Sequence, residues 1–424
     1  MNAFVLDPRV IELNCKTKLH LLHRHSSKVF VMRLKWPSAH LFDGQVTHGC
    51  GYIALKMLLE GTQSLDFDQF NRQLEGAGIE ISLTSDGFCF TVMEASLDKM
   101  LFILQELVNY SKPTEQRFEK LVKNEIDQFQ SLLDDGDSLA YLEFVKKVYM
   151  NTPFAHRIGG SVESLQKLTY SQVNQYIQEV LNWSNLSIYV SGAFDESKII
   201  KTLNSQVSLD VSDNGLKAKV QEPSFVKQNT SYFVVKDKKK SSLVMGHLGV
   251  IRHSDDYIKL KVLDHILGYG SGFVNRLCKR LREELGLCYS IYGDISTTSS
   301  WYPGCLNIQM GTRPENVLKA VTEIEQVLLD LKSSYVGQKE LDDVKSYLSG
   351  AMYFSIESNS SIARYLLEMD SYNLQKDFLL KQQSEISSIT LEDIFKVANQ
   401  YLHPDQMVRV VVGNSQPQGF VKLN

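Results

Sequence analysis

Residues 51–62 read GYIALKMLLEGT, and the spacing of their apolar side chains predicts one helix. Four of these side chains follow the i, i+1, i+4, i+5 spacing of a single buried helical face: Ile53, Ala54, Met57 and Leu58. The Glu-Gly-Thr end predicts that the helix stops there, with Gly61 as its C-capping residue. We therefore predict a helix that packs one face into a core.

An internal duplication organises the whole chain. Residues 168–192 (LTYSQVNQYIQEVLNWSNLSIYVSG) align without a gap with residues 389–413 (ITLEDIFKVANQYLHPDQMVRVVVG). In each copy Thr169 or Thr390 can cap a helix, with a Gln or Asp three residues on, as in a capping box or its near variant. A β-rich run follows each helix and ends at a glycine.

The segments before these copies repeat as well. Strand-like residues 26–36 and 241–250 each lead through a loop into a helix. Amphipathic helical patterns then recur in both halves, at 96–110 and 114–133, and at 314–333 and 338–356. The predicted fold class is α+β: two homologous α/β sandwich domains, each with helices on one face of a mainly antiparallel sheet.

A polar stretch separates the two halves. It is broken by Gly215 and Pro223, which is typical of an interdomain linker. We place the N-terminal domain at 1–205, the linker at 206–228 and the C-terminal domain at 229–424.

The frame G-x-x-x-x-x-M-L-x-x-G-T of residues 51–62 resembles the zinc helix of the insulinase/pitrilysin (inverzincin) peptidases. In that family the helix carries His-x-x-Glu-His, in which two His hold zinc and the Glu activates water. The resemblance matches these three positions to Tyr52, Leu55 and Lys56, and the third zinc ligand to Glu125. It implies a fold like that of insulinase and the mitochondrial processing peptidases, in which two subunits enclose a chamber.

None of the three matched helix residues can replace the family's residue. Lys56 is cationic at neutral pH, Leu55 has no lone pair, and a neutral Tyr52 is a poor ligand. Glu125 alone does not make a zinc site, so the sequence predicts a pseudo-peptidase. We further predict that Lys56 forms an ion pair with Glu125 in place of the metal, a pair that fixes geometry more than it adds stability.

A second motif lies in the C-terminal half. The segment from Arg282 to Ser290 (REELGLCYS) resembles the family's R-E-x-x-G-L-x-Y-S segment. In the family its Arg and Tyr face a zinc helix and bind the substrate backbone and the developing oxyanion, a role that the resemblance carries to Arg282 and Tyr289. The alternative is a surface Arg on an amphipathic helix and a strand Tyr packed in the sheet.

Composition limits the other classes of function. The net charge of -4 and the pI near 6.2 give no reason to propose nucleic acid or an anionic membrane as a partner. We expect no membrane span and no secretory signal, because neither apolar pattern is present. The six cysteines lack C-x-x-C spacing, which favours free thiols in the cytoplasm.

The resemblance implies a division of labour in a heterodimer. An active insulinase-like subunit would hold the zinc and the general base, and this chain, with no cofactor of its own, would supply Arg282 and Tyr289. Peptides or unfolded segments would be the substrates, bound as an added strand. Two alternatives stay open: a structural or peptide-binding scaffold without a role in proteolysis, and an active peptidase with an unusual site.

Overall fold

The structure is a computed structural model that describes residues 5–24, 27–39, 47–206, 229–270 and 275–423. The chain forms two compact units. Unit 1 contains residues 1–129, 156–220 and 353–378, and unit 2 contains residues 130–155, 221–352 and 379–424. Each unit is built around one six-stranded sheet.

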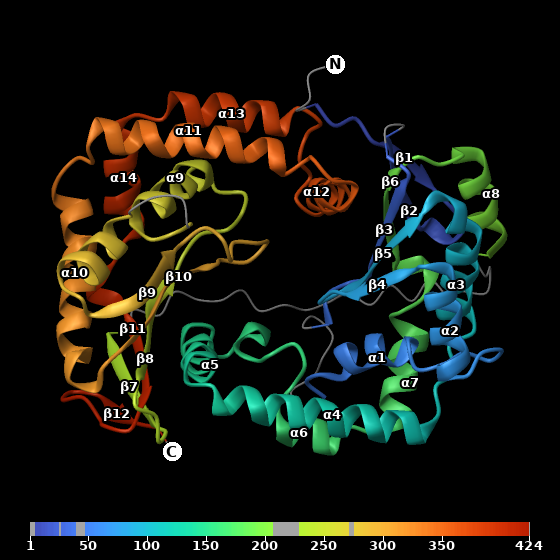
Figure 1. Ribbon diagram of the computed structural model, residues 1–424, viewed down its shortest axis with the longest axis horizontal. Coiled ribbons are helices and arrows are strands. Elements are labelled where there is room, and N and C mark those ends of the chain that lie inside the picture. The colour runs from blue at the N-terminus through green and yellow to red at the C-terminus, as the bar shows by residue number, and fades with distance from the viewer. Residues whose placement is uncertain (1–4, 25–26, 40–46, 207–228, 271–274, 424) are drawn as a thin grey trace. The chain divides into compact units, whose positions relative to one another are not determined.

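The sheet of unit 1 has the strand order β1-β2-β6-β3-β5-β4 (Figure 1). Its strands are β1 (Arg9–Glu12), β2 (Lys18–His23), β3 (Val29–Lys35), β4 (Glu80–Leu83), β5 (Gly87–Met93) and β6 (Ser187–Gly192). Only the β2–β6 pair is parallel. The register places Arg33 of the central strand β3 opposite Cys89 of β5 and Tyr189 of β6.

Helices cover both faces of the sheet of unit 1, and all of them except α12 form the main layer. They are α1 (Cys50–Leu58), α2 (Phe67–Ala77), α3 (Leu97–Asn109), most of α4 (Glu115–Asp134), α6 (Val162–Lys167), α7 (Tyr170–Glu179), α8 (Glu196–Gln206) and α12 (Asn359–Ser371). All four apolar residues predicted for the helix at 51–62 are fully buried, in one core with Phe30, Met32 and Leu34 of β3. The predicted helix and its buried face are confirmed.

The sheet of unit 2 has the strand order β12-β7-β11-β8-β10-β9. Its strands are β7 (Thr230–Val235), β8 (Ser241–Leu248), β9 (Cys288–Asp294), β10 (Cys305–Thr312), β11 (Val408–Gly413) and β12 (Val421–Lys422). Strand β9 forms one edge of this sheet and pairs with β10, and its Gly293 also makes an isolated antiparallel bridge with Gly268.

The helices of unit 2 follow the same scheme as those of unit 1. They are α5 (Gly136–Val148), α9 (Tyr257–Leu267), the π-helix η6 (Cys278–Glu284), α10 (Val317–Ser333), α11 (Gln338–Phe354), α13 (Phe378–Ser388) and α14 (Leu391–Tyr401). Short 3-10 helices occur in both units: η1 (Asn14–Lys16), η3 (Glu94–Ser96), η4 (Pro153–Ala155), η5 (Trp183–Asn185), η7 (Pro314–Asn316) and η8 (Pro404–Gln406).

The predicted fold class is confirmed, with one addition. Besides the main helical layer, one further helix covers the second face of each sheet. Helix α12 packs on β3 and β6, and α5 packs on β8, β10 and β11. The physical reason is visible in the burial of β8, where all eight residues are buried, so both faces need a cover.

The duplicated segments have the predicted capping geometry. Thr169 caps α7 and Thr390 caps α14, and in both capping boxes the side chain three residues on bonds back to the cap. The predicted C-cap of α1 is wrong. The helix ends at Leu58, because the N–H groups of Leu59 and Glu60 bond three residues back and tighten the last turn. Gly61, at φ +132°, lies in the following turn.

The compact units differ from the predicted domains in two segments. Residues 130–155 belong to unit 2, although they precede the linker, and residues 353–378 belong to unit 1, although they follow it. These segments carry α5 and α12, the helices on the second faces of the sheets. Of the predicted linker 206–228, residues 207–228 lie outside the described residues. No described helix is both long and apolar enough to cross a membrane.

Candidate functional site: a cation-filled helix pair and an exposed Arg/Tyr segment

The first site joins helices α1 and α4, which run side by side in Figure 1. Lys56, in the last turn of α1, donates from Nζ to Oε2 of Glu125 on α4 at 2.6 Å. The Glu125 side chain is completely buried, whereas that of Lys56 is 23% exposed. The ion pair predicted between these two residues is therefore present.

A third residue completes this cluster. Arg157 donates from Nη2 to the other carboxylate oxygen of Glu125, Oε1, at 2.8 Å. Its guanidinium also lies over the ring of Phe129, 5.2 Å from the centroid. Both oxygens of the buried carboxylate thus accept a hydrogen bond from a cation.

The charge on Glu125 is stabilised despite its burial. Burial by itself would raise the pKa of this carboxyl, but hydrogen bonds and charge from Lys56 and Arg157 outweigh burial and hold the pKa below its ordinary value of 4.5. At neutral pH the cluster therefore contains one carboxylate and two cations.

The loop that carries Arg157 is shaped by glycines. A Cβ on Gly159 would lie 2.5 Å from Nη1 of Arg157 and 3.0 Å from Oε1 of Glu125. Gly49, before α1, has φ +94°, and a Cβ there would lie 2.9 Å from the carbonyl oxygen of Gly159. Only residues without a side chain allow the loop to approach the helix this closely.

The other two positions matched to the zinc motif also lack the chemistry of ligands. Leu55 is 2% exposed and belongs to the apolar core. Tyr52 lies one turn before Lys56, whose ammonium is 5.0 Å from the centre of the Tyr52 ring. A zinc ion needs neutral or anionic donors, and the groups that bind Glu125 are two cations, so these residues do not fit the metal.

Sequence reasoning missed Arg157. The available signal was the segment HRIGG at 156–160, an arginine followed by two glycines just before a helix. Such a loop can approach a helix closely, but nothing in its sequence identifies the carboxylate that the arginine contacts.

The second site lies in unit 2, where η6 leads into the edge strand β9. Tyr289, the second residue of β9, is 94% exposed. Arg282, in η6, has a 45% exposed side chain, and its Nη2 donates to Oε1 of its neighbour Glu283 at 3.1 Å. The alternative of a strand tyrosine packed in the sheet is therefore wrong, because the ring of Tyr289 faces solvent.

The comparisons with known proteins agree on one family. Residues 167–348 match the family described as "Peptidase M16 inactive domain". The protein named "Non-peptidase homolog YmxG" of Helicobacter pylori is 23% identical over 375 residues, which are 87% of this chain and 85% of that protein. The "Uncharacterized zinc protease YmxG" of Bacillus subtilis is 22% identical, over 86% of this chain and 88% of that protein.

The fold agrees as well. The crystal structure of a peptidase M16 inactive domain from Pseudomonas fluorescens has a TM-score of 0.88 and 24% identity to this chain, and the match covers 97% of this chain and all of that one. The chain is similar to the M16 peptidases in both sequence and fold. It is a catalytically inactive M16-like protein: Leu55 and Lys56 lie at positions matched to the zinc motif, and the cations of Lys56 and Arg157 bind the buried Glu125 carboxylate.

Proposed function

We propose that this M16-like protein is the silent subunit of a heteromeric insulinase-like metallopeptidase. In this proposal an active partner supplies the zinc and the general base, and this chain supplies Arg282 and Tyr289 to the substrate held at the partner's site. The chain itself binds no cofactor. Its substrates are peptides or unfolded polypeptide segments, bound in a chamber that the two subunits enclose.

The observation that carries the proposal is the exposure of Tyr289. An aromatic ring that is 94% exposed on an edge strand contributes almost nothing to its own fold. A phenol O–H and a guanidinium are both donors suited to the negative charge that develops on a scissile carbonyl oxygen. The exposed pair is thus available to another molecule, whereas the cluster around Glu125 is closed by its own cations.

The cysteines support a cytoplasmic location, which we include in the proposal. The side chains of five of the six are described, and all five are free thiols: Cys50, Cys89, Cys278, Cys288 and Cys305. Free thiols of this number are typical of a reducing compartment.

The test is a cleavage assay with an M16 partner that carries an intact His-x-x-Glu-His. We expect no cleavage by this chain alone and cleavage of a fluorogenic peptide by the mixture. Removing one oxyanion donor typically lowers kcat by about 10²–10³-fold, so Tyr289→Phe and Arg282→Ala should each lower kcat by about that factor. Tyr335→Phe, an exposed tyrosine elsewhere in unit 2, is the matched control and should leave kcat unchanged.

Two outcomes would contradict the proposal. If the partner cleaves equally well without this chain, the chain acts as a scaffold or a peptide-binding protein. If the purified chain binds stoichiometric zinc and cuts peptides alone, it is an active peptidase with an unusual site.

A further inference from the structure

A cleft adjoins Tyr289 where three strand ends of unit 2 meet. Strand β9 begins at Cys288, β10 ends at Thr312 and β8 begins at Ser241, and Thr312 pairs with both other residues in the sheet. The cleft has a volume of about 340 Å³. It is lined by Lys239, Lys240, Gly286, Leu287, Cys288, Tyr289, Gly311, Thr312 and Arg313.

All charged side chains among the described residues that line this cleft are cationic. They are Lys239, Lys240 and Arg313, and all three are exposed. Lys240 pairs with Asp137 at 2.7 Å, and Arg313 approaches Glu315 at 3.6 Å. Because every partner in these pairs is more than half exposed, water screens both, and the cleft keeps an excess of positive charge.

Glycines shape the cleft so that a lysine crosses the end of the sheet. A Cβ on Gly311 would lie 2.7 Å from Cδ and 2.8 Å from Nζ of Lys240, so glycine at this position allows the lysine to lie across β10. At the rim, Gly286 has φ +59°, and a Cβ there would meet nothing within 4 Å. The entrance beside Tyr289 is therefore open.

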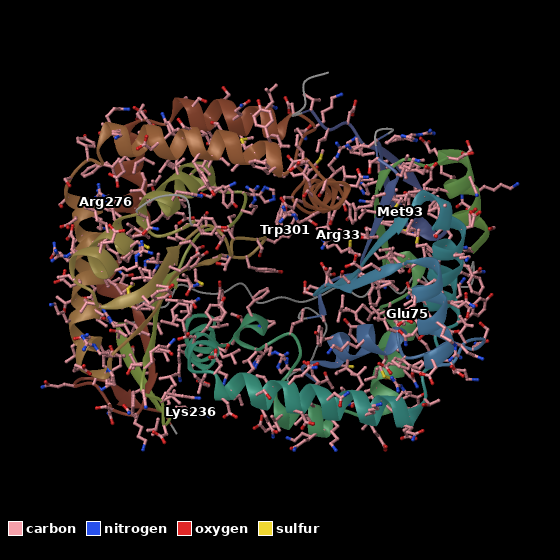
Figure 2. All side chains as sticks on the ribbon, in the orientation of Figure 1. Arg33, Glu75, Met93, Lys236, Arg276 and Trp301 are labelled. Carbon is pink, nitrogen blue, oxygen red and sulfur yellow. The ribbon has the colours of Figure 1, made fainter. Side chains whose placement is uncertain are left out.

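A larger cleft in unit 2 provides a contrast. It has a volume of about 820 Å³, and one of its lining residues is Arg276, labelled in Figure 2. Its charged residues of both signs are Arg276, Lys279, Arg280, Lys339, Glu284, Asp330, Glu340 and Asp343. Arg276 forms a two-pronged ion pair with Glu340, at 3.0 and 2.9 Å. Because its charges are balanced, the larger cleft favours neither anionic nor cationic ligands. The smaller cleft, with its excess of positive charge, favours anionic ones.

We propose that the cleft beside Tyr289 is a specificity subsite for a carboxylate of the peptide substrate. An Asp or Glu side chain close in sequence to the bond presented to Tyr289 would enter between Lys240 and Arg313. This inference rests on the proposed function, because it takes Tyr289 as the neighbour of the scissile bond. A free C-terminal carboxylate has the same chemistry and is the second source of such a group.

Binding to the purified full chain, without any partner, tests the subsite. The probes are three fluorescein-labelled octapeptides of alanine and serine. The first has an internal Glu and an amidated C-terminus. The second has Gln in place of this Glu and is also amidated. The third has the same Gln but a free C-terminal carboxylate. Screened ion pairs of this kind change affinity by roughly two- to fivefold each, so two contacts should favour the Glu peptide by about tenfold over the amidated Gln peptide.

Three variants locate the effect. The double variant Lys239→Gln with Lys240→Gln should reduce the preference for the Glu peptide several-fold. The single variant Arg313→Gln should do the same. Lys236→Gln is the matched control, since Lys236 (labelled in Figure 2) follows β7 in the same basic run and pairs with Asp134, but is not among the residues that line the cleft. It should keep the preference. At 0.5 M salt the preference should shrink, because the Debye length falls to about 4 Å.

The outcomes separate this inference from the proposed function. Any of three results would overturn the subsite. The Glu and amidated Gln peptides could bind with equal affinity, the preference for Glu could survive all three cleft substitutions, or the Glu peptide could fail to bind at 1 mM. Tighter binding of the peptide with the free terminus than of the Glu peptide would overturn the choice of an internal side chain. Cleavage by a partner that ignores Tyr289→Phe would overturn the proposed function while leaving these affinities as they are.

Discussion

Lys56→Met is the substitution that most directly perturbs the cluster in unit 1. Methionine keeps the apolar length of the lysine side chain but removes the donor 2.6 Å from the Glu125 carboxylate. Removing one partner of a buried ion pair typically costs 3–5 kcal/mol. Here Arg157 still donates to Glu125 and the lysine is 23% exposed, so we expect a loss of about 2 kcal/mol at pH 7.

Tryptophan fluorescence during urea unfolding reports the effect, because the buried tryptophans Trp36 and Trp183 are both in unit 1 and Trp301 of unit 2 is 56% exposed. A loss of about 2 kcal/mol corresponds to a downward shift of roughly 1 M in the urea midpoint. Lys120→Met, at an exposed lysine of α4, is the matched control and should change the free energy of unfolding by less than about 0.5 kcal/mol.

The pH dependence gives a second, independent readout. Because the pKa of Glu125 in the folded protein lies below its ordinary value of 4.5, the charged cluster stabilises unit 1 above pH 4.5, and this stabilisation is lost as the pH falls through the folded pKa. The difference between wild type and Lys56→Met should therefore be large at pH 7 and should shrink as the pH falls below 4.5 toward the folded pKa of Glu125. Adding Glu125→Gln to Lys56→Met should recover part of the loss, since the buried carboxylate is then replaced by a neutral amide whose oxygen can still accept a hydrogen bond from Arg157.

Equal urea midpoints for wild type and Lys56→Met at pH 7 would refute this reasoning. So would a difference that stays constant between pH 7 and pH 3.5, because the cost would then come from packing and not from the charge on Glu125.

Three other experiments test separate parts of the structure. The double variant Tyr52→His with Lys56→His restores two imidazoles one helical turn apart beside Glu125, and we expect it to bind about one zinc per chain by metal analysis, where Lys56→His alone binds none. Gly49→Ala, at φ +94° and against a backbone oxygen, should destabilise unit 1 by about 1–3 kcal/mol in urea, whereas Gly76→Ala inside α2, with nothing near its new Cβ, should stabilise it by about 0.5–1 kcal/mol. Burial lowers the pKa of His247 to about 4, so unit 2 should lose stability as the pH falls from 6.5 toward 4, and His247→Asn should flatten this slope in unfolding followed by circular dichroism.

Much of the fold could be predicted from local sequence patterns. The buried face of α1 follows from the spacing of Ile53 and Met57, and both capping boxes follow from a threonine with a polar residue three positions on. The end of α1 could not be predicted at the right residue. Gly61 is a strong stop signal, but whether a helix ends two residues earlier depends on how its last turn tightens.

The membership of the compact units could not be predicted from the order of segments. Helices α5 and α12 occupy corresponding places in the two halves of the chain, yet α5 belongs to unit 2 and α12 to unit 1. Their amphipathic patterns show that each must cover an apolar surface, but a helical period does not say which sheet provides it. Arg157 is a similar case, since its partner Glu125 lies 32 residues earlier and only tertiary structure brings them together.

The two sites differ in what their side chains contribute to stability, and this difference bears on function. A buried Glu125 without a metal would be an uncompensated charge, so Lys56 and Arg157 are explained by the needs of the fold alone. Arg282 and Tyr289 have no such explanation: one pairs only weakly with an exposed neighbour and the other is almost fully exposed. We expect Arg282→Ala with Tyr289→Phe to change the unfolding free energy of unit 2 by less than about 0.5 kcal/mol, as surface substitutions generally do. Suppose that this double variant has an unchanged free energy of unfolding but no longer increases cleavage by the partner. The pair then acts on another molecule and does not stabilise its own sheet.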